Sequence, residues 1–328
     1  MKFRIVLCCY MAFFIFQKGN AQPKPVVDGD WWQVATNPDV GDYTSENQEP
    51  VDFGIWQAAD GTWQIWSCIR GLKNGGKRRL FYRWEGKNLT DRNWKHMGIA
   101  MEADTTLSEN KGGLQAPYVF KRDGTYYMFY GDWNRICLAT SKDGKEFTRV
   151  DMNNGEPDLF EGPYLNTRDA MVMIENGLFY CYYTGHTESD GTLIENGEKV
   201  TKEYKCAIFC RTSADFKNWS EPVMVSAGGS PLEKCPWFGG DSECPFVVKR
   251  DGYYILFRNQ AYGPNNWNTQ YASKNPFNFG VGNDDFMIGT MPVAAPEIFT
   301  YQGQDYMAAL NPGLDGIRIT KLKWESEK

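Results

Sequence analysis

The fold is decided by one phrase that the chain repeats five times: VDFGIWQAADGTWQIW (51–66), QAPYVFKRDGTYYMFY (115–130), RDAMVMIENGLFYCYY (168–183), ECPFVVKRDGYYILFR (243–258) and AAPEIFTYQGQDYMAA (294–309). Each copy passes from a few apolar residues through a turn with Gly into a second, mostly aromatic run, which predicts a strand, a tight turn and a second strand. Copies that recur at intervals of about fifty to seventy-five residues indicate sheets arranged radially around one axis. We therefore predict an all-β chain, a five-bladed β-propeller. Its blades are expected to open near residues 51, 116, 169, 243 and 295.

The segments between the copies agree with this prediction. Helix signals are almost absent, and short runs of aromatic and β-branched residues alternate with turn dipeptides such as Asp123-Gly124 and Asn176-Gly177. A third strand and an outer strand are expected after each copy. The segment before residue 51 is predicted to close the ring by adding an outer strand to the fifth blade. Residues 188–203 are polar and read as an exposed hairpin insertion.

The first 21 residues have the pattern of a secretory signal peptide. Lys2 and Arg4 precede the apolar run 5–16, and small residues follow at 19–21. Residues 22–328 are then predicted to form a single propeller domain that is periplasmic or secreted. No other segment approaches twenty apolar residues, so we expect no membrane insertion after the signal is removed.

Charge and cysteine content narrow the function classes. Residues 22–328 carry 32 basic and 41 acidic side chains, a net charge of −9, and have no basic stripe, which argues against nucleic acid as a partner. Seven cysteines remain after the signal. Cys68, Cys137 and Cys181 are expected to be small buried apolar residues, whereas Cys235 and Cys244 either pair or stay free. With only two histidines, a structural zinc site is not expected, and we predict a monomer.

Alignment of the copies on the turn Gly predicts an acidic site at the axis. Nine residues before that Gly stand Asp52, Gln115, Arg168, Glu243 and Ala294. Asp52, Asp169 and Glu243 thus bring three carboxylates to ends that converge in a propeller. Charge in such a crowded place is unfavourable unless it is paired or used, which favours a functional site. The alternative is that Asp169 pairs with a neighbouring Arg while the others cap strand ends.

Two short motifs carry a resemblance to a known superfamily. Arg168-Asp169-Ala170 resembles the Arg-Asp-Pro motif of five-bladed glycosidases, and Glu243-Cys244-Pro245 resembles their Glu-Cys-Pro or Glu-Gly-Pro motif. The chain therefore resembles the superfamily that contains glycoside hydrolase families 43 and 32. The resemblance implies that Asp52 is the general base or nucleophile, Glu243 the general acid, and Asp169 the carboxylate that orients substrate and tunes the acid.

The chain departs from these families at three places. Asp52 is followed by Phe53-Gly54 instead of Pro, Ala170 replaces the usual Pro, and Glu161-Gly162-Pro163 is a second copy of the acid motif. Residues that contact substrate are expected among polar and aromatic side chains near the motifs. These candidates are Trp56, Gln57, Gln115, Trp133, Arg168, His186 and Arg258. For the Trp residues the alternative is packing between blades, and for His186 it is the capping of a turn.

We predict a glycosidase that removes terminal or side-chain sugars from plant or algal polysaccharide. The resemblance implies an arabinofuranosidase-like or xylosidase-like activity on an oligosaccharide or polysaccharide. Two alternatives stay open: a glycoside phosphorylase, which needs a basic phosphate subsite, and a carbohydrate-binding propeller without catalysis. No cofactor is expected to be required and no catalytic metal is predicted. A structural calcium ion in the central channel is left open.

Overall fold

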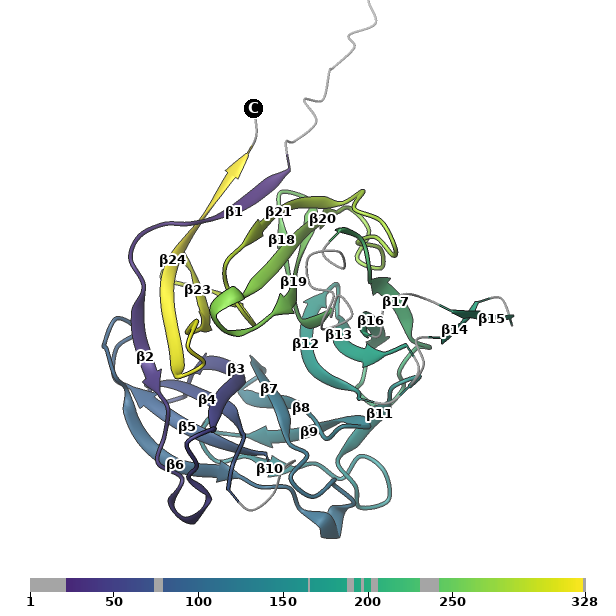
Figure 1. Cartoon of the computed structure of the whole chain (residues 1–328). Helices are drawn as coiled ribbons and strands as arrows, with labels where there is room; N and C mark the ends of the chain where they lie inside the picture. Colours follow the sequence, from purple (N-terminus) through teal and green to yellow (C-terminus); the bar gives the residue numbers. More distant parts are fainter. Residues whose placement is uncertain are drawn as a thin grey trace, which may run out of the picture.

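The computed structural model shows an all-β chain with five blades around one axis, as predicted (Figure 1). It describes residues 22–73, 79–164, 166–187, 192–195, 198–201, 206–230 and 242–326. The predicted signal peptide and Cys235 lie outside these residues. Among the described residues, no helix has the length and apolar character needed to cross a membrane.

Each blade is an antiparallel sheet whose first strand lies at the axis. Blade one has β3 (Glu49–Gln57), β4 (Trp63–Arg70), β5 (Leu80–Gly86) and β6 (Lys95–Met101). Blade two has β7 (Gln115–Arg122), β8 (Thr125–Gly131) and β9 (Arg135–Ser141), with β10 (Thr148–Arg149) and β11 (Asp158–Glu161) both paired to β9. Blade three has β12 (Arg168–Glu175), β13 (Leu178–His186), β16 (Cys206–Ser213) and β17 (Val223–Ser226).

Blades four and five complete the ring. Blade four has β18 (Glu243–Arg250), β19 (Tyr253–Ala261), β20 (Trp267–Ser273) and β21 (Met287–Met291). Blade five has β22 (Glu297–Tyr301), β23 (Gln304–Leu310) and β24 (Gly316–Ser326), with β1 (Pro23–Val27) and β2 (Trp32–Thr36) outside them. The innermost strands therefore begin within three residues of the predicted positions.

Short elements fill the connections. β14 (Thr192–Glu195) and β15 (Glu198–Thr201) pair with each other, which confirms a hairpin in the 188–203 insertion. Three 3-10 turns are also described, η1 (Gly41–Tyr43), η2 (Thr105–Leu107) and η4 (Gly263–Asn265).

The N-terminal segment closes the propeller. Both β1 and β2 pair antiparallel with β24, so residues from the two ends of the described chain share blade five (Figure 1). This pairing confirms the predicted closure. Strand β24 would otherwise present an unpaired edge, which natural sheets avoid because it invites association with other chains.

The tight turns between the first two strands of each blade explain the repeated phrase. In blades two to five the turn has two residues, Asp123-Gly124, Asn176-Gly177, Asp251-Gly252 and Gln302-Gly303, and both have positive φ. This is the type I′ geometry, which matches the twist of the flanking strands. Blade one instead uses the five residues 58–62. That longer turn shifts blade one against the other four when the copies are aligned on Gly.

Aromatic side chains fill the spaces between neighbouring blades. Trp56 and Trp66 of blade one pack on Phe147, which follows β9 of blade two. Phe120, Phe179 and Phe216 join blade two to blade three in the same way. At the axis the strands approach so closely that a Cβ on Gly54 would lie 2.4 Å from the carbonyl oxygen of Pro117. The core is therefore a set of wedges between blades, and little space is left at the axis.

Candidate active site

A ring of five residues with left-handed backbone surrounds the axis where the inner strands begin. One residue comes from each blade: Asp52 (φ 40°), Ala116 (46°), Asp169 (56°), Cys244 (45°) and Ala295 (46°). In blades one to four a β-bulge breaks the register at this point. Positive φ is unfavourable for residues other than Gly and is retained where the surrounding structure imposes it, often at functional sites.

This ring corrects the alignment made on the turn Gly. Asp52 is the counterpart of Asp169 and Cys244, whereas the counterparts of Arg168 and Glu243 are Val51 and Gln115. The one-residue error comes from the longer turn of blade one. Two of the three predicted carboxylates thus occupy equivalent places in the ring, and Glu243 stands one residue earlier on its strand.

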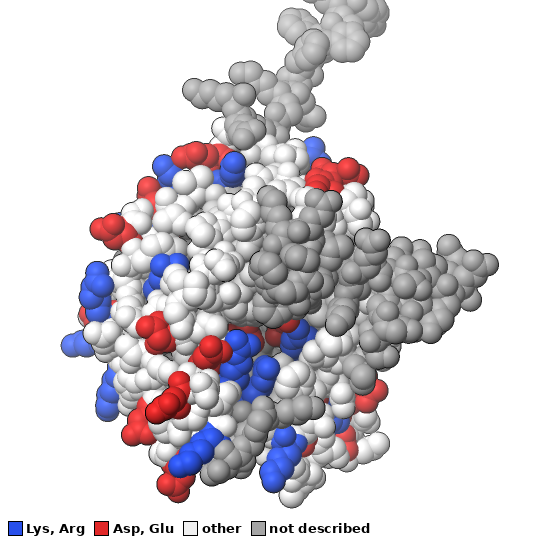
Figure 2. Space-filling view, in the orientation of Figure 1, with Lys and Arg blue, Asp and Glu red and all other residues white. Residues whose placement is uncertain are grey.

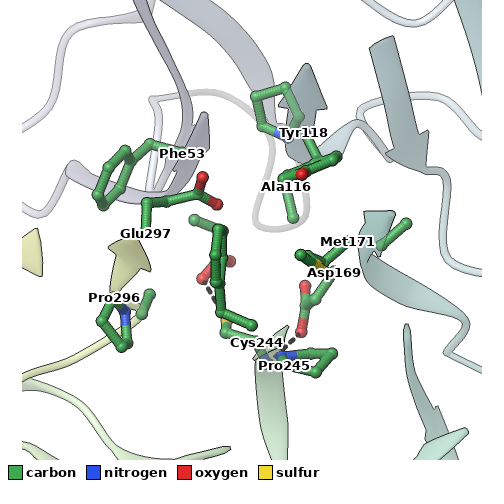
Figure 3. A pocket seen from close by; sticks show the side chains of 14 residues that line it. Phe53, Ala116, Tyr118, Asp169, Met171, Cys244, Pro245, Pro296 and Glu297 are labelled. Carbon is green, nitrogen blue, oxygen red and sulfur yellow. Dashed lines mark hydrogen bonds between the residues drawn. The ribbon is translucent and has the colours of Figure 1, made fainter. Parts of the chain in front are cut away.

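A small axial cavity of about 30 Å³ lies within this ring (Figure 3). Its wall is largely apolar and includes Pro117, Pro245 and Pro296 together with aromatic side chains. Asp52, Asp169 and Glu297 are the acidic residues of its lining. A few carboxyl groups in an apolar concave site are the usual composition of a small-molecule site.

Asp52 is held from blade four. The hydroxyl of Tyr262, directly after β19, donates a 2.9 Å hydrogen bond to Oδ1 of Asp52. The Cys244 sulfur lies 3.2 Å from the same oxygen and 2.9 Å from the Tyr262 oxygen. Burial raises the pKa values of both Cys244 and Tyr262 well above their usual ranges, and the neighbouring carboxylates add to the effect. Both groups therefore stay protonated near neutral pH and can donate to Asp52.

The pKa of the Asp169 carboxyl is moved toward neutral pH. Burial, with a further contribution from the charges of Asp52 and Glu243, raises the pKa of Asp169 to about 7, although Arg168 opposes the shift. Its Oδ2 accepts a 3.3 Å hydrogen bond from the backbone N–H of Cys244. Its Oδ1 is buried and has no hydrogen-bond partner among the residues that the structure describes. A free acceptor in such a place is unfavourable unless a ligand completes it.

Arg168 joins the third carboxylate to this pair. Its guanidinium forms an ion pair with Glu243, and its Nε lies 3.5 Å from Oδ2 of Asp169. Nη1 of Arg168 donates to the carbonyl oxygen of Asn166 at 3.0 Å, and Nδ2 of Asn166 lies 2.9 Å from Nε2 of His186. Along these contacts, two residues, Asn166 and Arg168, separate His186 from the carboxylates. Glu243 does not line the axial cavity itself, and its side chain is 16% exposed.

Two residues of this site were not predicted from the sequence. Tyr262 comes after the aromatic strand of blade four, and no motif marks it. Glu297 points into the cavity between Phe53 and Tyr118, and burial raises its pKa well above its usual range (Figure 3). A signal for Glu297 existed in the aligned copies, because it stands where three other blades carry Tyr118, Met171 and Phe246.

Among known proteins, the chain has similarity to solved structures but not to any family model or curated sequence. It is similar to a thermostable family-43 glycoside hydrolase at 17% identity and a TM-score of 0.61, over 89% of this chain and 93% of that one. It is similar to an exo-1,5-α-L-arabinanase from a bovine ruminal metagenomic library at 17% identity and a TM-score of 0.56, over 90% and 96%. A Bombyx mori family-32 β-fructofuranosidase is matched at 14% identity and a TM-score of 0.58, over 89% of this chain and 61% of that one.

This chain has the five-bladed propeller fold of glycoside hydrolase families 43 and 32. The predicted resemblance is confirmed at the level of the fold. The identities are too low to transfer an activity, so the functional argument depends on the site itself.

Some of the predicted substrate-contacting residues lie near the site, and others are buried in the packing between neighbouring blades. Trp56 is 6% exposed and donates from Nε1 to the carbonyl oxygen of Gly144, in the packing between blades. Arg258 is fully buried over the Tyr271 ring and donates to Ser226 Oγ and the Gly228 carbonyl oxygen. Both are packing residues, so we leave them out of the proposed site.

The remaining candidates lie at the two ends of the inner strands. Gln57 stands beside the turn of blade one, in a second cavity lined also by Trp63 and Tyr301, away from the carboxylates. Gln115 is buried at the start of β7, next to Ala116 of the ring. Trp133 is partly buried after β8 and pairs with Thr167, the residue before Arg168. Arg168 therefore contacts the carboxylates, whereas Gln115 and Trp133 lie beside Ala116 and Thr167, next to the ring and to Arg168.

The donor set does not suit calcium. Calcium takes six to eight oxygen ligands. One atom each of Asp52, Asp169 and Cys244 lie within 4.8 Å of one another, and a thiol among them suits softer metals. Asp52 is already engaged by Tyr262. We assign no role to a calcium ion. Cys68, Cys137, Cys181, Cys210 and Cys244 form no disulfide with a described residue, and the first three of these are buried as predicted.

Proposed function

We propose that this protein is a glycosidase that removes terminal or side-chain sugars from plant or algal polysaccharide. One observation supports the proposal most directly. Carboxylate oxygens of Asp52 and Asp169 lie within 4.8 Å of each other at the axis, and Arg168 connects Asp169 with Glu243. Glycosidic hydrolysis needs one carboxyl group to protonate the leaving oxygen and one carboxylate to activate water or attack the anomeric carbon.

Each carboxyl group then has a role. Asp52, oriented by the Tyr262 hydroxyl, is the general base or nucleophile. Glu243 is the general acid, and it can donate a proton only after substrate binding has loosened its ion pair with Arg168. Asp169, with its pKa of about 7, holds a proton part of the time at neutral pH and orients the substrate through its free oxygen. Asp169 is therefore the second candidate for the proton donor.

The axial cavity is small, about 30 Å³, so we expect the end or a branch of a saccharide, and not an uninterrupted chain, to reach the carboxylates beside it. The similarity to an exo-acting arabinanase supports a pentose such as arabinofuranose or xylose as the sugar released. An oligosaccharide or polysaccharide is the proposed partner.

The proposal is tested with aryl and oligosaccharide glycosides of arabinofuranose and xylose. Asp52→Asn is expected to lower kcat by about 10²-fold or more, because loss of the base or nucleophile removes a step that every substrate needs. Asp123→Asn is the matched control, since Asp123 also has positive φ but lies in an exposed turn. Equal activity of wild type and Asp52→Asn would refute the assignment of Asp52. Retained saccharide binding with no hydrolysis of any glycoside would identify a carbohydrate-binding propeller without catalysis.

A further inference from the structure

Arg79 is an arginine near the start of the inner strands, and its side-chain contacts with described residues are to the neutral groups of Trp133, Gln115 and Cys68. It lies just before β5, and its Cζ is 4.6 Å from the centre of the Trp133 ring. Its Nη1 donates a 3.1 Å hydrogen bond to Oε1 of Gln115. Within the described part of the chain it forms no ion pair with an Asp or Glu, whereas nearby Arg70 is paired with Glu49. No carboxylate of the described residues therefore neutralises its positive charge.

Arg79 is connected to Arg168 of the carboxylate cluster through Gln115 and Gly131. Gln115 begins β7 and pairs with Gly131 of β8. A Cβ on Gly131 would lie 2.9 Å from Cα of Arg168, so only Gly lets the Arg168 backbone approach this closely. Arg79, Gln115 and Arg168 are thus neighbours from blade one to blade three. Near the centre of the face drawn in Figure 2, basic and acidic side chains lie side by side.

Gln115 adds a second donor that lacks an acceptor. The residue is fully buried, and within the described ranges its Nε2 has no hydrogen-bond partner. Because arginine can only donate, the atom that faces Arg79 must be the amide oxygen, which leaves the NH₂ group as the free donor. A buried donor without an acceptor is unfavourable by itself and becomes favourable when a ligand supplies the acceptor.

Trp133, whose ring packs on the Arg79 guanidinium, has a strained backbone conformation. Its φ of 80° is unusual for a bulky residue, and its backbone carbonyl accepts a 2.9 Å hydrogen bond from Thr167. A Cβ on Gly113 would lie 2.8 Å from Cδ1 of Trp133, so a side chain at residue 113 would displace the ring. Strain of this kind is kept at sites that hold a ligand or a reactive group. The ring packs against one face of the guanidinium, which also donates to Gln115 and forms a side-chain hydrogen bond with Cys68.

We propose that Arg79 and Gln115 bind an oxyanion, and that the substrate of this site is an acidic saccharide. The inference rests on the proposed glycosidase function and specifies its substrate class. The guanidinium fork matches the two oxygens of a carboxylate or sulfate, and the Gln115 NH₂ group supplies a further donor. A uronic acid or a sulfate ester of the polysaccharide provides this group. Free inorganic phosphate provides the same chemistry, and in that case the bond is cleaved by phosphate instead of water.

Binding is measured by calorimetry in the Asp52→Asn background, so that ligands are not consumed. Each acidic saccharide is paired with a neutral counterpart: aldobiouronic acid with xylobiose, and digalacturonic acid with galactobiose. Inorganic phosphate is titrated separately. We expect an acidic member to bind about 10- to 100-fold more tightly than its neutral counterpart, the range for charge-assisted hydrogen bonds, and the difference to shrink as salt is added.

Three variants assign the effect to this pair of residues. Arg79→Gln is expected to remove the preference for the acidic ligand, and Arg79→Lys to keep part of it, because Lys retains the charge without the planar fork. Arg83→Gln is the control, since Arg83 lies on β5 of the same blade but is paired with Glu146. Arg79→Lys also keeps the test decisive if Arg79→Gln does not fold.

The outcomes separate this inference from the proposed function. Equal affinity for acidic and neutral ligands, or a preference that survives Arg79→Gln, overturns the oxyanion site. Phosphate binding that Arg79→Gln abolishes, together with phosphate-dependent cleavage by wild type, supports the site and identifies phosphate as its occupant. If wild type hydrolyses no glycoside while Arg79 still determines the preference for acidic ligands, the glycosidase proposal fails and the binding site stands.

Discussion

Arg168 at the start of blade three forms an ion pair with Glu243 at the start of blade four. The pair is largely buried, with the Arg168 side chain 9% exposed and the Glu243 side chain 16% exposed. The same guanidinium lies 3.5 Å from Asp169. One cation therefore faces two carboxylates, and any change in the charge of one carboxylate alters the environment of the other.

The first prediction concerns Glu243 as the proton donor. Glu243→Gln is expected to lower kcat/KM about 10²- to 10⁴-fold on substrates whose leaving group needs protonation. On dinitrophenyl glycosides the loss should be small, because that leaving group departs without a proton. The ratio of the two losses is measured, since it is unaffected by any fraction of unfolded protein. Folding itself needs a check, because the substitution leaves Arg168 with one carboxylate fewer.

Two further variants make this prediction specific. Glu161→Gln removes the carboxylate of the second Glu-Gly-Pro motif, which is exposed on β11, and it is expected to leave both rates unchanged. If Asp169→Asn shows the dependence on the leaving group and Glu243→Gln does not, the proton donor is Asp169.

The second prediction concerns stability and pH. The pKa of Asp169 is raised from an ordinary value near 3.8 to about 7, so the folded state binds an extra proton between these pH values. The contribution of this group to stability is therefore complete at low pH and is lost as pH rises through about 7. The free energy of unfolding, measured with urea across this range, should fall with pH more steeply in wild type than in Asp169→Asn. Parallel curves for the two proteins would contradict the raised pKa.

The third prediction concerns the crowded axis. In Gly54→Ala the new Cβ would lie 2.4 Å from the carbonyl oxygen of Pro117, a backbone atom that cannot move without displacing its strand. We expect a loss of about 1–3 kcal/mol in the free energy of unfolding. Gly289→Ala is the control, because the nearest atom there is Cε of Lys24, at 3.2 Å on a flexible side chain. Similar stability of the two variants would mean that the axis accommodates a side chain.

The fourth prediction concerns closure of the ring. A chain that begins at Gln22 keeps β1 and β2, whereas a chain that begins at Asn37 lacks both and exposes the edge of β24. The shorter chain is expected to unfold at lower temperature and to associate, because an unpaired strand edge can pair with another chain. Calorimetry and light scattering of the two chains measure this. Identical melting and monodisperse behaviour would show that closure contributes little.

Much of the fold was predictable because its signals are local. A two-residue turn with positive φ requires residues such as Asp, Asn and Gly, and the strands beside it require aromatic and β-branched residues, so each blade is marked within about sixteen residues. The starts of the five inner strands were therefore predicted to within three residues. The register of blade one was not, because the five-residue turn at 58–62 contains an Asp-Gly pair like the shorter turns.

The candidate site was predictable only in part. Asp52 and Asp169 were expected at the axis because equivalent positions of a repeat converge there. The pairing of Arg168 with Glu243, the hydrogen bond from Tyr262 to Asp52 and the position of Glu297 depend on how neighbouring blades meet. The same is true of Trp56 and Arg258, which looked like substrate contacts and are packed between blades.

The sequence by itself determined the number of blades, the turns between their strands and the residues that open each inner strand, because backbone conformation and strand burial are set by neighbouring residues. Only the tertiary structure decided which of those residues touch. Arg79, Gln115 and Trp133 are separated along the chain and meet where blades one and two approach the axis. The charge, the burial and the unpaired hydrogen-bonding groups of the site arise where side chains of neighbouring blades contact each other. The chemistry of the site could therefore not be predicted from any single copy of the repeat.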